Sequence, residues 1–175
     1  MGLRHDAREW ALQFLFQSEF NQDASLNKAF QYFWQFQDEI ASVPPAMSVL
    51  DPAEQNLQHT RQLKARRFAE ELARGVISEH NEIDKILTNS TSNWEIDRMG
   101  TVERNVMRLA VFEMLRRKDI PPVVSINEAV ELAKSYSSIE SGKFVNGILD
   151  RIRMAIDRPA REVADDLPAP STETP

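Results

Sequence analysis

PPVVSINEAVELAKSYSSIESGKFVNGILD, residues 121–150, contains two apolar patterns of helical period that are separated by a polar turn. Ser125 stands three residues before Glu128, which is the spacing of a capping box, where each side chain satisfies a free backbone N–H at a helix start. Pro121 and Pro122 disfavour helix immediately upstream. We therefore predict two short helices, of which the first begins at this capping box.

The same helical period recurs along the rest of the chain, and no strand pattern is visible. The predicted helices cover residues 4–20, 25–39, 53–80, 101–118, 126–136 and 141–156. Apolar residues surround most of the helix over 101–118, so we expect it at the centre of the fold. Asn146-Gly147 would favour a hairpin between strands, but the spacing around it is helical. We interpret Gly147 as a position where helices pack closely.

Two segments interrupt this pattern. Residues 42–52 contain three prolines and are expected to form a loop. Beyond residue 158 the chain has little apolar content and carries four carboxylates against one arginine, which is half of the net charge of −6. We therefore expect residues 159–175 to form a disordered acidic tail, and residues 1–158 to form one helical domain.

The composition, with 42% hydrophobic and 27% charged residues, is that of a soluble globular protein. The absence of cysteine excludes disulfides, thiol nucleophiles and cysteine-based zinc sites. Four charges lie within the first ten residues, where a signal peptide would need an apolar run. No stretch approaches the ~18 apolar residues that span a bilayer. We therefore expect a cytoplasmic protein that does not bind a membrane.

Reactive residue types do not converge in a catalytic pattern. The histidines, His5, His59 and His80, lie on separate segments without the spacing of metal ligands. The five glycines form neither a phosphate-binding loop nor a dinucleotide fingerprint, and no serine lies in a GxSxG motif. We expect no enzymatic activity, no metal and no cofactor.

A small cationic patch stands at the N-terminus. Arg4 and Arg8 share one helical face by i,i+4 spacing, with His5 beside them, which suits contact with phosphate. Asp6 and Glu9 partly neutralise this patch, and two arginines fall short of a basic stripe. The residues alone favour an ordinary charged helix start.

Several blocks of the sequence, taken together, resemble one family. INEAVELAKSY at 126–136 and SGKFVNGILDRI at 141–152 closely resemble the C-terminal signature of the bacterial transcription antitermination factors of the NusB family. AREWALQFLFQ at 7–17 and VERNVMRLAVFEML at 102–115 resemble the opening and central helices of that family. The blocks occur in the family's order and span most of the chain up to residue 158. Only the Pro-rich loop and the acidic tail lack counterparts.

The resemblance implies an all-α fold of two perpendicular three-helix sub-bundles that share a core. It also implies a noncatalytic adaptor with NusE, a ribosomal protein of the small subunit, as its partner. The pair would bind the boxA element of nascent ribosomal RNA and join the elongating RNA polymerase complex. The expected ligand is single-stranded RNA, whose bases are exposed for recognition.

The family's functional positions carry over to named residues of this chain. Those expected to contact RNA are Arg4, His5, Arg8, Glu140 and Lys143. Those expected to contact NusE are Phe16, Glu103 and Phe144. The N-terminal arginine cluster is sparser than in familiar members, so we expect weaker RNA affinity and heavier reliance on NusE. Phe16 stands where tyrosine is frequent, and Glu140 replaces an aspartate.

Two other functions remain open at this point. NusB-like domains also occur at the N-terminus of a ribosomal RNA cytosine methyltransferase, where they serve an enzyme. Some family members form homodimers that bury the first helix, which would give a helical adaptor without RNA binding.

Overall fold

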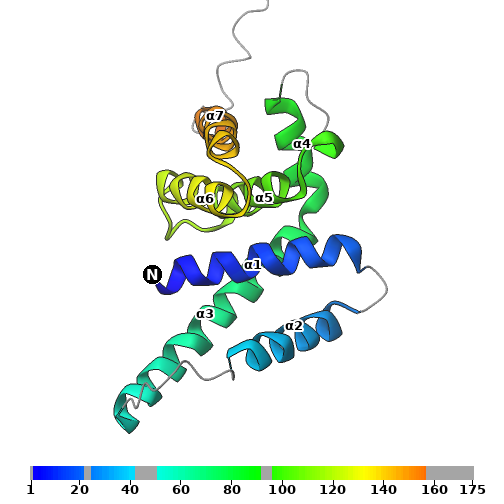
Figure 1. Ribbon diagram of the computed structural model, residues 1–175. Helices are drawn as coiled ribbons and strands as arrows, with labels where there is room; N and C mark the ends of the chain where they lie inside the picture. Colours follow the sequence, from blue (N-terminus) through cyan, green and yellow to red (C-terminus); the bar gives the residue numbers. More distant parts are fainter. Residues whose placement is uncertain (1, 22–24, 42–50, 92–95, 157–175) are drawn as a thin grey trace, which may run out of the picture.

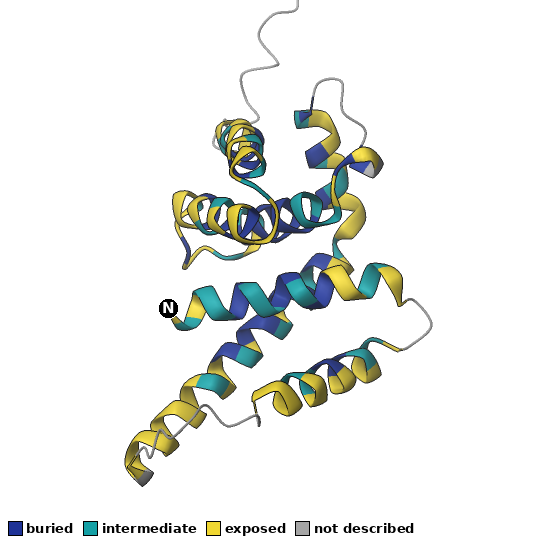
Figure 2. Ribbon diagram, viewed as in Figure 1, coloured by how far each residue is buried: buried dark blue, intermediate teal, exposed yellow. Residues whose placement is uncertain are grey.

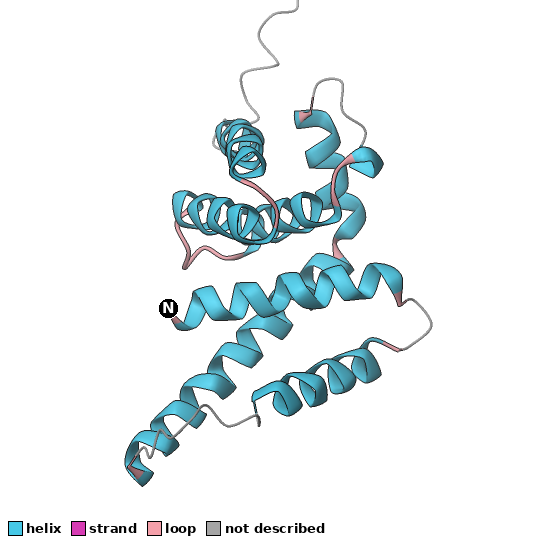
Figure 3. Ribbon diagram, viewed as in Figure 1, coloured by secondary structure: helices cyan, strands magenta, loops and turns pink. Residues whose placement is uncertain are grey.

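A computed structural model describes residues 2–21, 25–41, 51–91 and 96–156. Within these ranges the chain forms seven α-helices and one short 3-10 helix, and no strand (Figures 1 and 3). In chain order the elements are α1 (Leu3–Phe20), α2 (Leu26–Ala41), α3 (Pro52–Ser78), α4 (His80–Ser90), η1 (Ile96–Arg98), α5 (Thr101–Arg116), α6 (Pro122–Tyr136) and α7 (Ile139–Ile156). The all-α prediction is confirmed. Most of the predicted loop, at 42–50, and the predicted tail, at 159–175, lie outside the described residues.

The helices form two groups that meet at α1 and α5. In the first group α1 packs against both α2 and α3, and in the second α5, α6 and α7 pack against one another. Helix α4 packs against α5 and α7. Figure 1 shows α7 nearly end-on while α1 lies across the view, so these two helices run in crossed directions. Contacts of α1 and α3 with α5 join the groups through a shared core.

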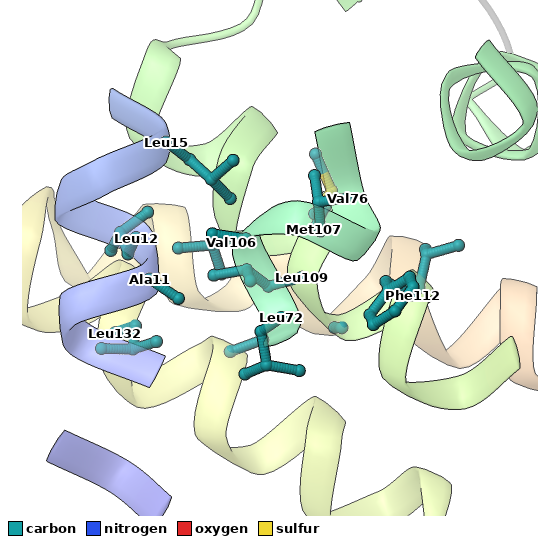
Figure 4. Packing of buried hydrophobic residues seen from close by; sticks show 14 of the residues in the cluster. Ala11, Leu12, Leu15, Leu72, Val76, Val106, Met107, Leu109, Phe112 and Leu132 are labelled. Carbon is teal, nitrogen blue, oxygen red and sulfur yellow. The ribbon is translucent and has the colours of Figure 1, made fainter. Parts of the chain in front are cut away.

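Helix α5 is the centre of the fold, as its apolar circumference predicts. Every residue from Asn105 to Glu113 is buried, because α5 has neighbours in both helix groups. Figure 4 shows side chains of α1, α3 and α6 converging on those of α5, with Leu12, Leu72 and Leu132 among them. This single apolar cluster fixes α1 relative to the second group of helices.

Helix α6 begins earlier than predicted, and the capping-box prediction is wrong. Pro122 occupies the first turn, where its missing N–H costs no hydrogen bond. Ser125 is therefore inside the helix, and its hydroxyl donates to Glu113 Oε2 at 2.5 Å. Glu128 Oε2 instead lies 2.8 Å from His5 Nδ1. Both side chains serve contacts with other helices rather than the helix start.

The prediction of close packing at Gly147 is also wrong, although the position is helical as expected. A Cβ at Gly147 would meet nothing within 4 Å. A close approach between helices occurs at Gly75 of α3, where a Cβ would overlap the ring of Phe112. Gly75 therefore lets the ring of Phe112 on α5 rest directly on the backbone of α3.

The first half of α3 extends away from the shared core. Figure 2 shows it as almost continuously exposed, in contrast to the buried second half. Residues 53–61 are all exposed, whereas Leu72 and Ala73 are fully buried. The chain bends at Glu79, between α3 and α4, where φ is −107° and ψ is 15°. The long helix thus anchors one end in the core and presents the other to solvent.

Candidate functional site

Arg8, predicted to contact RNA, lies in a buried ion pair between α1 and α5. Its side chain is 4% exposed, and that of Glu113 is 1% exposed. Arg8 Nε donates to Glu113 Oε1 at 2.7 Å, and Arg8 Nη2 donates to Glu113 Oε2 at 3.1 Å. Arg8 Nη1 donates to the Arg4 carbonyl oxygen at 3.1 Å. The guanidinium is fully engaged inside the protein, so in this structure it is not available to a phosphate.

Arg4 and His5 lie nearer to the surface, but each also has an acidic neighbour. Arg4 Nη2 donates to Asp119 Oδ2 at 3.0 Å, and both side chains are about half exposed. His5 is only 20% exposed and contacts Glu128. Arg4 is therefore the one cation of the predicted N-terminal patch that an RNA phosphate can reach without rearrangement.

Guanidinium groups from α1 and from the loop after α5 surround the ring of Phe68 on α3. The Cζ atoms of Arg4, Arg8 and Arg117 lie 5.5, 5.7 and 4.9 Å from the ring centroid. Such contacts are attractive because the face of an aromatic ring is electronegative. Asp119 bridges Arg4 and Arg117, and the hydrogen bond from Arg117 holds the pKa of the Asp119 carboxyl below its usual range. This arrangement fixes the start of α1 against α3.

Glu103, which is predicted to contact a protein partner, lies near the C-terminal end of α6. The ion pair of Arg8 and Glu113 lies near the N-terminal end of the same helix. Ser137 and Ser141, in and after the turn between α6 and α7, each donate a hydroxyl hydrogen bond of 2.6 Å to Glu103 Oε1. Burial raises the pKa of Glu103, but these hydrogen bonds outweigh it, and the pKa lies below its ordinary value. The carboxylate is thus held ionised at a fixed position in the first turn of α5, where the helix dipole favours it.

Three predicted contact residues share one hollow at this position. Its lining residues are Arg98, Met99, Gly100, Glu103, Glu140, Ser141 and Phe144, and its volume is about 310 Å³. We call it the Glu103 hollow. Glu103 and Phe144 were predicted to contact NusE and Glu140 to contact RNA, so residues assigned to different ligands meet here. Lys143 is exposed one residue before Phe144 on the same helix.

Phe16 lies on an exposed face of α1 that is joined to this hollow. Glu9, Gln13, Phe16 and Phe20 follow at steps of three or four residues, so they share one face. Tyr136 donates to Glu9 at 2.5 Å and accepts from Gln13 at 2.8 Å. The next residue, Ser137, is the donor to Glu103. Phe16 is 41% exposed, so this α1 face presents an apolar ring to solvent.

Glu19 is a residue that no sequence pattern selects. Its carboxylate accepts from Arg104 at 2.5 Å, Asn105 at 2.9 Å and Arg108 at 2.9 Å, all on α5. Burial raises its pKa, but hydrogen bonds and the nearby arginines lower it further, so the net shift is downward. Glu19 therefore fixes the end of α1 that presents Phe16. Its partners are more than eighty residues away, so no local pattern could have revealed it.

A model of the NusB family matches residues 5–154. The chain belongs to the NusB family. A transcription antitermination protein NusB from Myxococcus xanthus is 40% identical over 159 residues, which cover 91% of this chain and 100% of that protein. Another, from Desulforapulum autotrophicum, is 38% identical over 165 residues, covering 93% and 100%. The resemblance seen in the sequence is thus confirmed.

Solved NusB structures share this fold. NusB from T. maritima matches with a TM-score of 0.66 and 36% identity, covering 86% of this chain and 90% of that one. A crystal structure of the antitermination factors NusB and NusE in complex with double-stranded RNA matches with a TM-score of 0.65 and 27% identity. That match covers 87% of this chain and 97% of the other. A NusB protein therefore binds both NusE and RNA with this helical scaffold.

In the described residues of this NusB-family chain, no helix combines the length and the apolar character that spanning a bilayer requires. In the same ranges, no group of three or more histidine, aspartate or glutamate side chains is arranged to hold a metal ion.

Proposed function

We propose that this protein is a transcription antitermination factor that acts as an adaptor and makes or breaks no covalent bond. It binds a NusE-type ribosomal protein and the boxA element of nascent ribosomal RNA, and the complex joins elongating RNA polymerase in the cytoplasm. The support is its membership of the NusB family, together with the NusB–NusE–RNA complex formed by a protein of the same fold.

The observation that carries the proposal is the ionised carboxylate in the Glu103 hollow. A buried charge without a hydrogen-bond partner destabilises a protein. The Glu103 carboxylate already accepts two hydrogen bonds from serine hydroxyls. A carboxylate has about four acceptor positions, so it retains capacity for a donor from another protein. The partly buried ring of Phe144 lines the hollow, and the exposed ring of Phe16 adds apolar area on α1. A cationic or N–H group flanked by apolar side chains fits this combination.

Capture of NusE by variants at Glu103 tests this proposal. Glu103→Lys should lower the affinity for NusE about tenfold to a hundredfold, since a hydrogen bond to a charged group contributes about 1.5–3 kcal/mol. Glu103→Gln keeps the serine hydrogen bonds and removes only the charge, so it separates recognition from folding. Glu82→Lys, at an exposed position on α4, is the matched control. Equal capture by all four proteins would reject the assigned surface.

Addition of boxA RNA to the same assay tests the second ligand. A mixture with NusE should bind boxA RNA more tightly than either protein alone. Light scattering with and without RNA would reveal the competing homodimer, in which exposed Phe16 and Phe20 are covered by a second copy. The methyltransferase accessory role is less favoured, because the matched relatives carry the antitermination name. Failure to capture NusE at micromolar concentration would overturn the proposal.

A further inference from the structure

Three exposed cations on α3 have no use in the fold. Arg61, Lys64 and Arg67 are spaced by three residues, and all are exposed. None makes an ion pair or side-chain hydrogen bond with any residue that the structure describes. We call these three residues the α3 basic stripe. The arginines of α5 differ, because Arg104, Arg108 and Arg116 each bind a carboxylate.

The stripe carries an electrostatic cost that the fold does not offset. Residues three apart on a helix are neighbours, so Arg61 repels Lys64, and Lys64 repels Arg67. Two of the acidic residues nearby are committed elsewhere. Asp38 binds Arg66, and Glu71 binds Arg117. A polyanion bound along this face would relieve the repulsion between the three cations.

The stripe continues the predicted RNA-binding region at the start of α1. Arg61 lines one hollow together with Gly2, Leu3 and Asp6, so the first turn of α1 lies beside it. Lys64 stands four residues before Phe68, on the same helical face. Phe68 is the ring that Arg4 and Arg117 contact. The stripe therefore begins, at Arg61, beside the first turn of α1, which also holds Arg4.

We propose that the α3 basic stripe binds the phosphates of single-stranded RNA. The proposal rests on the RNA-binding function proposed above and assigns part of that binding to α3. Arg8 is enclosed and His5 faces Glu128, so α1 alone offers little accessible charge. The stripe spans about 9 Å along the helix axis at 1.5 Å per residue. It is thus an extended cationic surface that suits contact with an RNA backbone without reading the bases.

Salt-dependent RNA binding by a triple variant tests the stripe. The variant R61Q/K64Q/R67Q removes three charges and keeps good helix formers on an exposed surface, so the fold is retained; circular dichroism verifies this. The control K28Q/K85Q/R151Q removes three exposed charges from α2, α4 and α7. The probe is labelled single-stranded boxA RNA, with and without NusE. Affinity is measured across a series of salt concentrations, and NusE capture is measured separately.

The stripe variant should bind RNA about tenfold to a hundredfold more weakly than the parent protein. The slope of log affinity against log salt concentration should be shallower by about 2 in this variant, since each phosphate contact on a single strand contributes about 0.7 to the slope. NusE capture should be unchanged, and the control should bind RNA like the parent.

Parent-like RNA affinity and salt slope in the stripe variant would overturn the α3 assignment while leaving the adaptor function standing. An equal loss of RNA affinity in the control variant would show that net charge, rather than this surface, determines RNA binding. That result would also overturn the α3 assignment. Loss of NusE capture alone would identify the stripe as a protein-binding surface instead. If the parent protein itself binds no boxA RNA with NusE present, the adaptor function fails and this assignment fails with it.

Discussion

Replacing Arg8 should destabilise the protein rather than weaken its contact with RNA. Arg8 and Glu113 are nearly inaccessible, and the Glu113 carboxylate accepts two hydrogen bonds from Arg8 and one from Ser125. Arg8→Met leaves that carboxylate buried with a serine as its remaining side-chain donor. Removing one partner of a buried ion pair costs about 3–5 kcal/mol. That is a large share of the ~5–15 kcal/mol that stabilises a typical domain.

Urea denaturation measures this loss directly. With a slope of about 2 kcal/mol per molar urea, a loss of 4 kcal/mol lowers the midpoint by about 2 M. Arg4→Met is the control, because its half-exposed pair with Asp119 should contribute at most about 1 kcal/mol. The triple variant R8M/E113L/S125A removes the buried charges together and should recover most of the loss, since an apolar replacement of a buried ion pair is often neutral.

RNA binding distinguishes this structural role from a direct contact. Under conditions where Arg8→Met is folded, its RNA affinity should stay within about twofold of the parent, which is a change of roughly 0.4 kcal/mol. A stability loss below about 1 kcal/mol, accompanied by a large loss of RNA affinity, would refute the reasoning. It would mean that Arg8 leaves its pocket to bind phosphate.

Glycine substitutions should have opposite effects at two helical positions. Gly75→Ala should lower the free energy of unfolding by about 1–3 kcal/mol, because the Phe112 ring blocks a Cβ. Gly147→Ala should raise the free energy of unfolding by up to about 1 kcal/mol through helix propensity. Thermal melts in which both variants shift stability in the same direction would contradict these contacts. Partial burial and the Glu9 carboxylate raise the pKa of Tyr136 to about 12. Because folding raises this pKa, the stabilisation is complete below about pH 10, the ordinary tyrosine pKa, and is lost as the pH rises towards 12. In a Tyr32→Phe variant, tyrosinate absorbance should therefore appear near pH 12 in the folded state, and a midpoint near 10 would exclude the hydrogen bond to Glu9.

Helix positions were predictable because they depend on local spacing. The apolar period and the prolines locate α1, α2, α3, α5, α6 and α7 to within about four residues, and the high apolar content of α5 correctly predicts its central position. Family motifs also select Glu103, Glu140 and Phe144, which meet in one hollow. The helix positions follow from residues close together in the chain, whose relative orientation on a helix is set by its 3.6-residue turn, whereas the hollow joins residues of α5 and α7.

What each polar side chain does was decided by tertiary structure. Ser125 and Glu128 have the spacing of a capping box, yet they bind Glu113 and His5 on other helices. Arg8 looks like a surface arginine, and its carboxylate partner lies 105 residues away. A hydrogen bond needs its two atoms within about 3 Å, whatever their separation in sequence. Helical periodicity therefore reveals which face of a helix is buried, but only the packing of distant helices determines which charges remain available to RNA or to a protein partner.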